Sequence, residues 1–460
     1  MDRIFRGKVE GGRESAMKVL LINPSWGSLI SKKGRRFNRA WPPLDLLNCG
    51  ALLEREGIGV EVMDARASNF SADEIAQRAK DFDKVFITSS PIDRWQCPNL
   101  DLENFFNMLQ PLPKNNLYIM GVHGTLYPEM VLEKSGACAL IRGEPEMTVL
   151  ELCKTDNLTT VKGITYKKDG QIVSNENRLS LNMSDLPIPA YHLIDINKYE
   201  YELLGGRLAL LEASRGCPFP CIYCLHEMYG GRRYRKKPMQ NILAEIDYIV
   251  RTAGAESLYF IDLEFTLDKD FVHQICDHII EKGYTLSWCC QTRADAVNLE
   301  LLKKMKKAGC HLIHYGVETG SEKVMATIDK NIKLSQIEEG ISLTKRAGIE
   351  TACFFIFGFP GETDADREAT IQFAKMLNPT YASFHIASPY PGTKLYKMSG
   401  SRELFPEAYT REHSQKALEE KVRRAYKMFY IRPAYILSRV INGNPAIWRK
   451  QLKLFKGFIK

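Results

Sequence analysis

The sequence contains no hydrophobic run that approaches the roughly 20 residues needed to span a membrane. Residues 1–16 form a polar, charged tail without the apolar core of a signal peptide. We therefore expect a cytoplasmic protein, in which thiols stay reduced. The twelve cysteines show no pairing pattern, so a disulfide-based scaffold is not expected.

Glycine-rich nucleotide-binding motifs are also missing. Neither GxGxxG nor GxxxxGK followed by Ser or Thr occurs, so the sequence gives little support to a nicotinamide cofactor or to ATP. No acidic residue follows Glu420, whereas eleven basic residues lie between Lys421 and Lys460. The net charge of +8 therefore reflects a basic tail rather than a basic protein. Because no recognised nucleic-acid module accompanies this tail, nucleic acid is not an expected partner.

What the sequence does contain is short apolar runs that alternate with amphipathic stretches. Within residues 17–155 the runs are KVLLINP, VEVMDA, KVFITSS, LYIMGVHG and ALIRGE. Such continuous apolar strands, separated by helices, predict a parallel α/β sheet that is covered on both faces. We expect a doubly wound, Rossmann-like domain whose ligand lies beyond the carboxyl ends of the strands.

A second alternating series occupies residues 201–396, after a connector at 156–200 that contains a hairpin around Asp169-Gly170. Its six runs are LALLEAS, SLYFID, LSWCCQT, LIHYGV, TACFFIFG and YASFHIAS. Six strand–helix units predict a partial (β/α)6 barrel with its active site at the carboxyl strand ends. Residues 397–460 are expected to form a small, basic, helical extension.

Three cysteines, Cys217, Cys221 and Cys224, directly follow the first strand of the second series. A structural zinc site would need four ligands, and no second cysteine pair lies at a suitable spacing. A [4Fe–4S] cluster held by three thiolates instead keeps one iron open. Zinc or incidental core cysteines are the alternatives to this interpretation.

The CxxxCxxC spacing resembles that of the radical S-adenosylmethionine (SAM) superfamily. The resemblance implies that the open iron binds SAM, which is cleaved reductively to methionine and a 5′-deoxyadenosyl radical. Motifs at successive strand ends support it: YFIDLEFT, QTRAD, HYGVETGSEKVM, FFIFGFPGET and SPYPGTKLY. Each of them alone is more typical of an ordinary ion pair or turn. The SAM-contacting residues implied by the resemblance are Tyr223, Asp262, Glu264, Arg293, Glu318, Phe357, Gly358 and Pro389.

Roles follow from the resemblance residue by residue. Either Asp262 or Glu264 would hold the methionine amino group, and which of the two acts stays open. Arg293 would hold the SAM carboxylate, since a guanidinium fork suits that group. Glu318 would contact the ribose. Tyr223, Phe357 and Gly358 would surround the adenine, which the backbone must approach closely at a glycine. Pro389 belongs to the motif that the resemblance places after the sixth strand.

The first series resembles the cobalamin-binding domain of cobalamin-dependent radical SAM enzymes. The matching stretches are WPPLDLLNCGALLEREG, IMGVHGTLYPE and IRGEPEMTVLEL. The histidine-ligating motif DxHxxG is absent, so cobalamin is expected without a histidine on cobalt, and His123 is expected to hydrogen-bond or to be structural. A doubly wound domain without a cofactor is the alternative. The implied cobalamin-binding residues are Leu44, Ser89, Ser90, Gly121, His123, Thr125, Gly143 and Glu144.

Among these enzymes the chain most resembles C-methyltransferases. The resemblance implies methylation of an unactivated carbon through methylcobalamin and a 5′-deoxyadenosyl radical, under anaerobic conditions. A cyclase or rearrangement enzyme acting on a tetrapyrrole, lipid or natural product without methyl transfer is the main alternative, and a non-catalytic sensor is another.

Two partners follow from this interpretation: a flavodoxin- or ferredoxin-type reductant, and a substrate for which a peptide or protein is slightly favoured. In the basic tail, Trp448, Leu452, Phe455 and Ile459 share one helix face. That helix would pack on the barrel, or its basic neighbours would contact an anionic membrane surface.

Overall fold

The computed structural model describes residues 17–25, 39–91, 98, 102–225 and 232–442. The chain has the expected α/β fold, with one seven-stranded and one six-stranded sheet. The polar tail at 1–16 lies outside the described residues, as does the predicted apolar face of Trp448, Leu452, Phe455 and Ile459.

The first sheet has the strand order β2-β1-β3-β4-β5-β6-β7. Its parallel strands are β1 (Lys18–Asn23), β2 (Gly59–Asp64), β3 (Lys84–Thr88), β4 (Leu117–Met120) and β5 (Ala139–Ile141). The hairpin expected in the connector adds two antiparallel strands at the edge, β6 (Ile164–Lys168) and β7 (Gln171–Ser174). The central residues of β1 and β3 and all of β4 are apolar because the sheet is buried on both faces.

Helices cover both faces of the first sheet. One face packs against α1 (Leu44–Arg55) and α7 (Glu146–Lys154). The other packs against α3 (Ala72–Ala79), α4 (Glu103–Leu109) and α6 (Pro128–Ser135). The short helices α2 (Ala65–Ser68) and α5 (Val122–Leu126) follow β2 and β4 directly. Strand order and layers therefore place loops after β1, β3, β4 and β5 along one edge, where ligands bind in such sheets.

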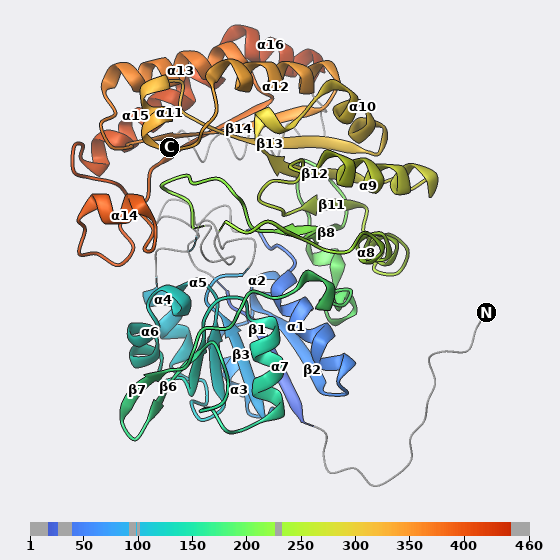
Figure 1. Ribbon diagram of the computed structural model, residues 1–460, viewed down its shortest axis with the longest axis vertical. Coiled ribbons are helices and arrows are strands. Elements are labelled where there is room, and N and C mark those ends of the chain that lie inside the picture. Colours follow the sequence, from blue (N-terminus) through green and yellow to red (C-terminus); the bar gives the residue numbers. More distant parts are fainter. Residues whose placement is uncertain (1–16, 26–38, 92–97, 99–101, 226–231, 443–460) are drawn as a thin grey trace.

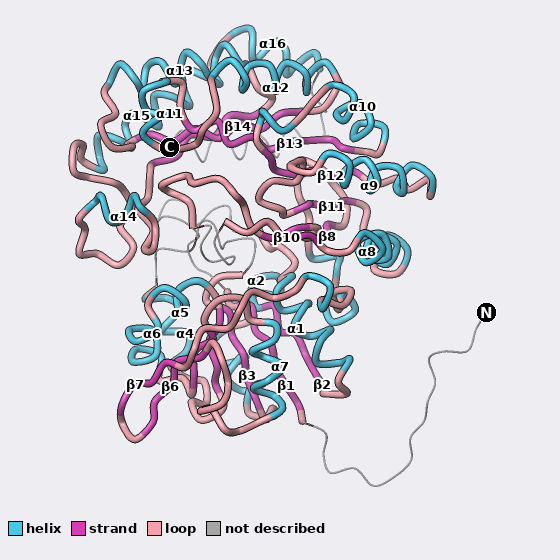
Figure 2. The backbone as a smooth tube through the Cα atoms, viewed as in Figure 1, coloured by secondary structure: helices cyan, strands magenta, loops and turns pink. Residues whose placement is uncertain are grey.

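The second sheet is entirely parallel, with its strands in chain order from β8 to β15. It consists of β8 (Leu208–Leu211), β11 (Ser257–Phe260), β12 (Ser287–Thr292), β13 (Cys310–Glu318), β14 (Glu350–Phe357) and β15 (Tyr381–Ile386). The helices between them are α8 (Met239–Arg251), α9 (Lys269–Glu281), α10 (Leu299–Lys307), α11 (Glu322–Thr327), α12 (Leu334–Arg346) and α13 (Asp364–Leu377). Figure 2 shows these helices on the outer side of the strands. A small ribbon of β9 (Ser214–Arg215) and β10 (Arg235–Lys236) follows β8.

The two sheets face each other through their loops. In Figure 1 the carboxyl ends of the first sheet point toward the second sheet. A shared apolar cluster joins Leu44 and Val122, at the first sheet's edge, to Leu210 and Leu312 inside the barrel. On one face of β14, Phe354 and Ile356 stay partly exposed, whereas Phe355 and Phe357 on the other face are buried. The barrel interior is therefore accessible, and the first sheet borders it.

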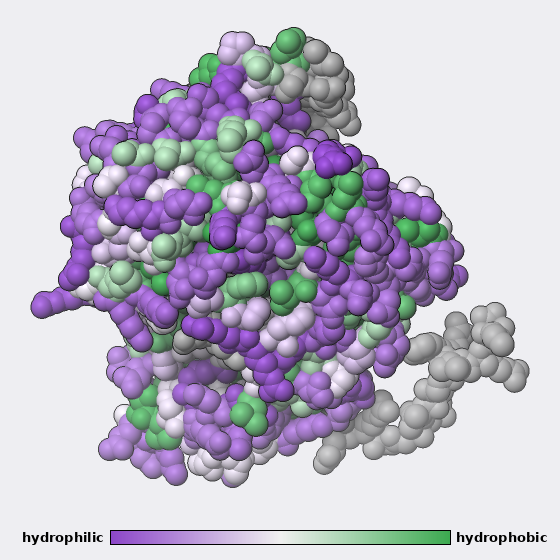
Figure 3. All heavy atoms as spheres, turned by 45° about the horizontal axis from the view of Figure 1, so that its top comes forward, coloured by the Kyte–Doolittle hydropathy of each residue, from purple (hydrophilic) through white to green (hydrophobic). Residues whose placement is uncertain are grey.

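The chain continues after β15 into α14 (Lys394–Ser399), α15 (Gln415–Tyr430) and α16 (Pro433–Asn442). α15 packs on β15 through Tyr426 and Phe429, so this part of the extension is helical and attached to the barrel. Ile436 and Leu437 of α16 are largely exposed. The face of the molecule in Figure 3 is mainly hydrophilic, with hydrophobic side chains in small groups. None of the helices in the described ranges combines the length and hydropathy that a membrane span requires.

Candidate functional site

The cysteine triad lies in the loop that leaves the first barrel strand. Cys217 is buried, whereas Cys221 and Cys224 are partly exposed. The loop is fixed from two sides: Ile222 N–H donates to the Ile328 carbonyl at 3.1 Å, and Leu395 N–H donates to the Ile222 carbonyl at 2.9 Å. The three thiols are thereby held at the carboxyl edge of the barrel. We call residues 216–225 the cluster loop.

The donor set of this loop fits a cluster better than a single ion. Within the described ranges, no three His, Cys, Asp or Glu side chains converge closely enough to hold one metal ion. Thiolates of a [4Fe–4S] cluster bind different irons, so their sulfurs need not converge in that way. Three soft thiol donors without a fourth are the ligand set that such a cluster needs to keep one iron open.

The two acidic candidates after β11 have different surroundings. Asp262 accepts hydrogen bonds from Ala213 N–H at 3.1 Å and Ser214 Oγ at 2.5 Å, so it ties the end of β8 in place. Glu264 accepts from Arg293 N–H at 2.8 Å. Burial raises the pKa of both carboxyls to about 7. The charge of Glu264 also acts on Cys217 and Cys221, so Glu264 is the acid that lies beside the cluster loop.

Arg293 lies in the site, but its guanidinium is already engaged. It donates to both carboxylate oxygens of Asp295, at 2.9 and 2.8 Å. It also donates to the carbonyls of Lys330, at 2.7 Å, and Asn331, at 3.0 Å. Its Cζ atom lies 3.8 Å from the ring centroid of Phe219 in the cluster loop. Arg293 thus braces this loop and the segment after α11.

A second cation, Lys330, occupies the centre of the site. Its Nζ lies 2.7 Å from Glu318 Oε1 and 3.5 Å from the hydroxyl of Tyr223. Both charged side chains are at least 90% buried, with 8% and 7% exposure. Although burial alone would lower the pKa of Lys330, the charges of Glu318 and Cys221 raise it. Lys330 is therefore a fixed positive charge beside the cluster loop.

Glu318 adopts a conformation that a non-glycine residue rarely takes, with φ of 68°. The strand pairing shifts register between Gly316 and Glu318. A Cβ at Gly316 would meet Glu318 Oε1 and would lie 2.8 Å from Lys330 Nζ, so a larger residue there would displace this buried ion pair. Strained backbone that is maintained by its surroundings is typical of functional sites.

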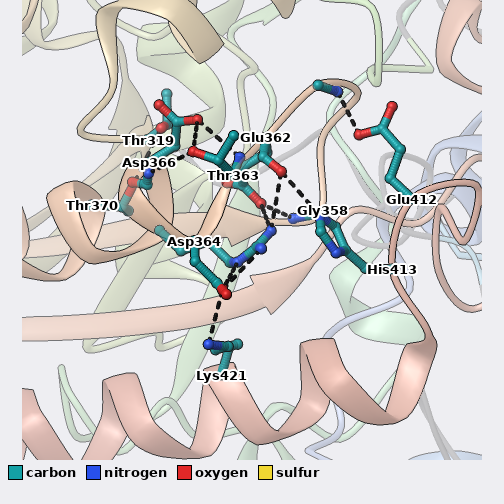
Figure 4. Close-up of polar contacts among 12 residues, drawn as sticks. Thr319, Gly358, Glu362, Thr363, Asp364, Asp366, Thr370, Glu412, His413 and Lys421 are labelled. Atoms are coloured by element: carbon teal, nitrogen blue, oxygen red, sulfur yellow. Dashed lines mark hydrogen bonds and ion pairs between the residues drawn. The ribbon is translucent and has the colours of Figure 1, made fainter.

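The motif after β14 builds a rigid loop. Gly358 N–H donates to Glu362 Oε2 at 2.5 Å, and Arg367 Nη1 donates to the same oxygen at 3.0 Å. Figure 4 shows how the C-terminal extension reaches this loop: His413 lies 2.9 Å from the Glu362 carbonyl, and Lys421 lies 2.8 Å from Asp364. The extension therefore holds the predicted adenine motif in place.

Three predicted SAM residues differ in where their side chains lie. Tyr223 is partly exposed and its ring centroid is 5.4 Å from that of Phe359. Pro389 is buried in the loop after β15. The side chain of Phe357 stacks on Phe384 in the core beneath the outer helices, so only its backbone lies at the strand end.

The carboxyl edge of the first sheet is built from small, neutral residues. Gly121 adopts φ of 105° and ψ of −172°, and a Cβ there would lie 2.9 Å from Ser90 N and 3.0 Å from Ser89 Oγ. Ser89 Oγ is buried without a hydrogen-bond partner. Thr125 Oγ1 donates to the Gly121 carbonyl and accepts from Gly143 N–H, each at 2.9 Å. A close-approach glycine and an unsatisfied hydroxyl fit a large ligand that offers hydrogen-bonding amides. We call these five residues the first-sheet edge.

Three further residues predicted for this edge have other surroundings. Leu44 is buried as the first residue of α1. His123 is fully buried and its ring lies 5.1 Å from that of Phe405, in an edge-on contact. Glu144 points away toward the barrel, where its carboxylate pairs with Arg215 and Arg235. Glu144 therefore joins the two sheets.

Comparison with known proteins agrees with this geometry. The model of the radical SAM superfamily matches residues 211–374. An uncharacterized methyltransferase of Pyrococcus horikoshii is 30% identical over 95% of this chain and 97% of that protein. The structure of the cobalamin-dependent SAM radical enzyme OxsB superposes with a TM-score of 0.75 at 16% identity, over 96% of this chain and 71% of that chain. The chain belongs to the radical SAM superfamily, and its fold is similar to that of a cobalamin-dependent member.

Two further matches bear on how far the likeness extends. The anaerobic magnesium-protoporphyrin IX monomethyl ester cyclase of Cereibacter sphaeroides is 26% identical over 91% of this chain and 71% of that protein. Another OxsB structure matches with a TM-score of 0.66 at 19% identity, over 78% of this chain and 52% of that chain. The chain thus spans about half of that solved chain in this superposition.

Two residues of the candidate site, Lys330 and Arg215, were not predicted from the sequence. Lys330 follows a helix rather than a strand, and its neighbours Asp329 and Asn331 have φ of 55° and 53°. Acidic and amide residues tolerate this conformation, so the Asp-Lys-Asn triplet was a signal for a tight turn that presents the lysine. Arg215 stands directly before Gly216 and the first cysteine, but its carboxylate partners are too distant in sequence to be inferred.

Proposed function

We propose that this protein is a cobalamin-dependent radical SAM methyltransferase that acts on an unactivated carbon. The main support for the proposal is that the barrel edge with the cluster loop and the first-sheet edge face the same interior. A three-thiol cluster loop with buried charges lies at the barrel, and a neutral first-sheet edge borders the same interior. When bound, the cluster with SAM supplies radical hydrogen abstraction, and cobalamin supplies methyl transfer.

The barrel residues divide the work of binding SAM. Cys217, Cys221 and Cys224 would hold the cluster. Glu264 is the acid proposed for the amino group, because Asp262 is committed to Ala213 and Ser214. Lys330 is proposed to neutralise the carboxylate, because the guanidinium of Arg293 is bound by Asp295 and two carbonyls.

The remaining SAM contacts are proposed to come from the rim of the barrel. Glu318 would contact the ribose, and Tyr223 would pack against the adenine with the backbone of Phe357 and Gly358 and with Pro389. The hydrogen bond from Gly358 N–H to Glu362 keeps that backbone in position. The resemblance had implied the roles of Glu318, Tyr223, Phe357 and Gly358, whereas the adenine contact of Pro389 is a new proposal.

The first-sheet edge is proposed to hold cobalamin without a protein ligand on cobalt. Ser89, Ser90, Gly121, Thr125 and Gly143 offer hydroxyls and close backbone approach. Leu44, at the start of α1, would pack against the macrocycle. The ring of His123 is buried against Phe405, which supports a structural role for this histidine.

The barrel interior supports a substrate whose reacting part is uncharged. Tyr259, His314 and Phe354 form a row of nearly parallel rings, with centroids 5.5 and 5.7 Å apart. Burial lowers the pKa of His314 to about 4, so its ring is neutral at pH 7. Lys330 is paired with Glu318. An apolar lining excludes water and stray hydrogen donors from a radical.

The decisive experiment measures the two co-products. The reconstituted protein, with cobalamin and a chemical or flavodoxin-type reductant, is incubated anaerobically with methyl-deuterated SAM and cell extract. Methylation predicts S-adenosylhomocysteine and 5′-deoxyadenosine in equal amounts, with label on a carbon of one substrate. Loss of that label would contradict the proposal.

Ring formation is a second candidate because the Cereibacter cyclase resembles this chain over 91% of its length. A cyclase would form 5′-deoxyadenosine without S-adenosylhomocysteine in the same assay. The methyltransferase is favoured, because the relative with the higher identity and coverage carries that name.

Several finer points are also proposals. We also propose domain boundaries at residues 155, 200 and 396. The protein is proposed to act in the cytoplasm, with a flavodoxin or ferredoxin as its reductant. A peptide or protein substrate stays a prediction. Contact with an anionic membrane is supported by the exposed Ile436 and Leu437 and by the basic tail. Such surfaces bind membranes because apolar side chains insert and basic side chains attract anionic lipids.

A further inference from the structure

A buried guanidinium joins the two halves of the molecule. The side chain of Arg215 has 0% exposure. Its Nη1 lies 3.3 Å from Glu144 Oε2, its Nη2 lies 2.9 Å from Glu146 Oε1, and its Nη2 lies 2.6 Å from Glu212 Oε2. Arg235, in the adjacent strand β10, also pairs with Glu144.

The partners of Arg215 come from both sheets. Glu144 and Glu146 follow β5 of the first sheet, and Glu146 begins α7. Glu212 follows β8, the first strand of the barrel. We call Glu144, Glu146, Glu212 and Arg215 the interdomain ion cluster.

This ion cluster stands between the two proposed cofactor sites. On one side, Glu144 follows Gly143, whose N–H donates to Thr125 in the first-sheet edge. On the other side, Arg215 precedes Cys217 by two residues in the same chain segment. The first-sheet edge is therefore linked to the cluster loop by the ion pair between Glu144 and Arg215 and by a few covalent bonds on either side of it.

The chemistry of the ion cluster requires arginine. Three buried carboxylates need a partner with several donors in a fixed plane, and a guanidinium has five. Although burial alone would raise the pKa of Glu144, Arg215 and Arg235 hold it below its ordinary value. Buried ion pairs often add little net stability. A role for this ion cluster in fixing the relative position of the two sheets is therefore better supported than a role in stability.

We propose that Arg215 is a positioning residue that fixes the first-sheet edge relative to the cluster loop, and so sets the separation of cobalamin and SAM. This inference rests on the proposed function, because it assigns both cofactors. Radical transfer depends steeply on such separation, and a displacement of about 1 Å can cost about 100-fold in rate.

The first test is Arg215→Lys, which keeps the charge and loses the fork. We expect iron and cobalamin contents to match those of the wild type, while the ratio of 5′-deoxyadenosine to S-adenosylhomocysteine rises, because SAM cleavage continues without methyl transfer. A wild-type ratio at full cofactor content would overturn the proposal. Wild-type protein that binds no cobalamin would instead contradict the proposed function, and it would leave the second test to decide on the ion cluster.

The second test compares two isosteric variants, Glu146→Gln and Glu245→Gln. Glu245 is a matched control, since it pairs with Lys237 at 2.6 Å and is equally buried, but both partners belong to the barrel. In hydrogen exchange, Glu146→Gln should increase exchange in residues 143–148 and in residues 212–217 together. Glu245→Gln should leave residues 143–148 unchanged. Independent responses of the two segments to Glu146→Gln would contradict the coupling, whether or not Arg215→Lys folds.

Discussion

The two edges that face each other across the interior handle polarity in opposite ways. At the barrel edge, Glu318 and Lys330 are buried side chains of opposite charge beside the cluster loop, and the partly exposed Glu264 lies near them. At the first-sheet edge, the ligand-facing groups are hydroxyls and backbone at Ser89, Gly121 and their neighbours. The charged Glu144 there turns toward Arg215 and Arg235.

This contrast matches the ligands proposed for each edge. A zwitterion bound to a metal cluster needs fixed charges of both signs, which a protein supplies in a dry site at a desolvation cost. A large macrocycle with neutral amides needs close backbone approach and hydrogen bonds. Variants that perturb one edge at a time therefore test this contrast.

The largest effect is expected from the cluster loop. Replacing Cys217, Cys221 and Cys224 together with Ala should remove the cluster, which holds about four irons per chain, and should abolish SAM cleavage. Iron analysis and the optical spectrum after anaerobic reconstitution measure the cluster content. The amount of 5′-deoxyadenosine formed measures SAM cleavage. Cobalamin binding should persist, because the first-sheet edge is separate. Full iron content in this variant would refute the assignment.

The next effect separates the two cations of the barrel edge. Lys330→Met should weaken SAM binding about 100-fold, since truncating one partner of a buried charge pair costs about 2–5 kcal/mol. Lys237→Met is the control, because Lys237 and Glu245 form an equally buried pair away from the site. Both should lose similar unfolding free energy, but only Lys330→Met should lose SAM affinity by calorimetry. Unchanged affinity would return the carboxylate role to Arg293.

The sequence was sufficient to predict the strands and most of the barrel edge. The apolar runs coincide with β1–β5 and with β8 and β11–β15, because buried parallel strands are hydrophobic throughout. Glu264 and Glu318 could be found because Glu318 ends β13 and Glu264 lies four residues after the end of β11. Cys289, Cys290 and Cys353 are buried in these strands as small apolar residues.

The parts that could not be predicted depend on contacts distant in sequence. Lys330 acquires its role only when the loop after α11 folds back onto Glu318 and Tyr223. Glu144 was predicted to face a cofactor, yet a buried carboxylate needs counter-charges, and these come from Arg215 and Arg235 in the other half of the molecule. Local pattern carries no information about such pairings.

A smaller effect is expected at the first-sheet edge. Gly121→Ala places a Cβ against Ser90 N in a backbone region that is accessible almost only to glycine, at a cost of about 1–3 kcal/mol. We expect cobalamin affinity to fall about tenfold, which about 1.4 kcal/mol would produce. Gly136→Ala is the control, with φ of 65° and no atom nearer than 3.9 Å. Its cobalamin titration should match the wild type, and a wild-type titration for Gly121→Ala would contradict the role of this edge.

The smallest effect is expected on the pH dependence of stability, from Glu362. This residue accepts a hydrogen bond from Gly358 N–H in the predicted adenine motif. Burial raises the pKa of Glu362 to about 7, although the Gly358 N–H and Arg367 favour the charged form. Its pKa is lower in the unfolded chain, about 4.3 for a free Glu, so the folded state binds more protons between these values. The free energy of unfolding should therefore fall as pH rises through this window, by at most about 1.4 kcal/mol per pH unit. Glu362→Gln keeps an acceptor for Gly358 and cannot titrate, so urea titrations of the variant between pH 5 and pH 7 should show a flatter dependence. A slope equal to that of the wild type would mean that Arg367 keeps Glu362 charged, and the barrel rim would then carry one further fixed charge.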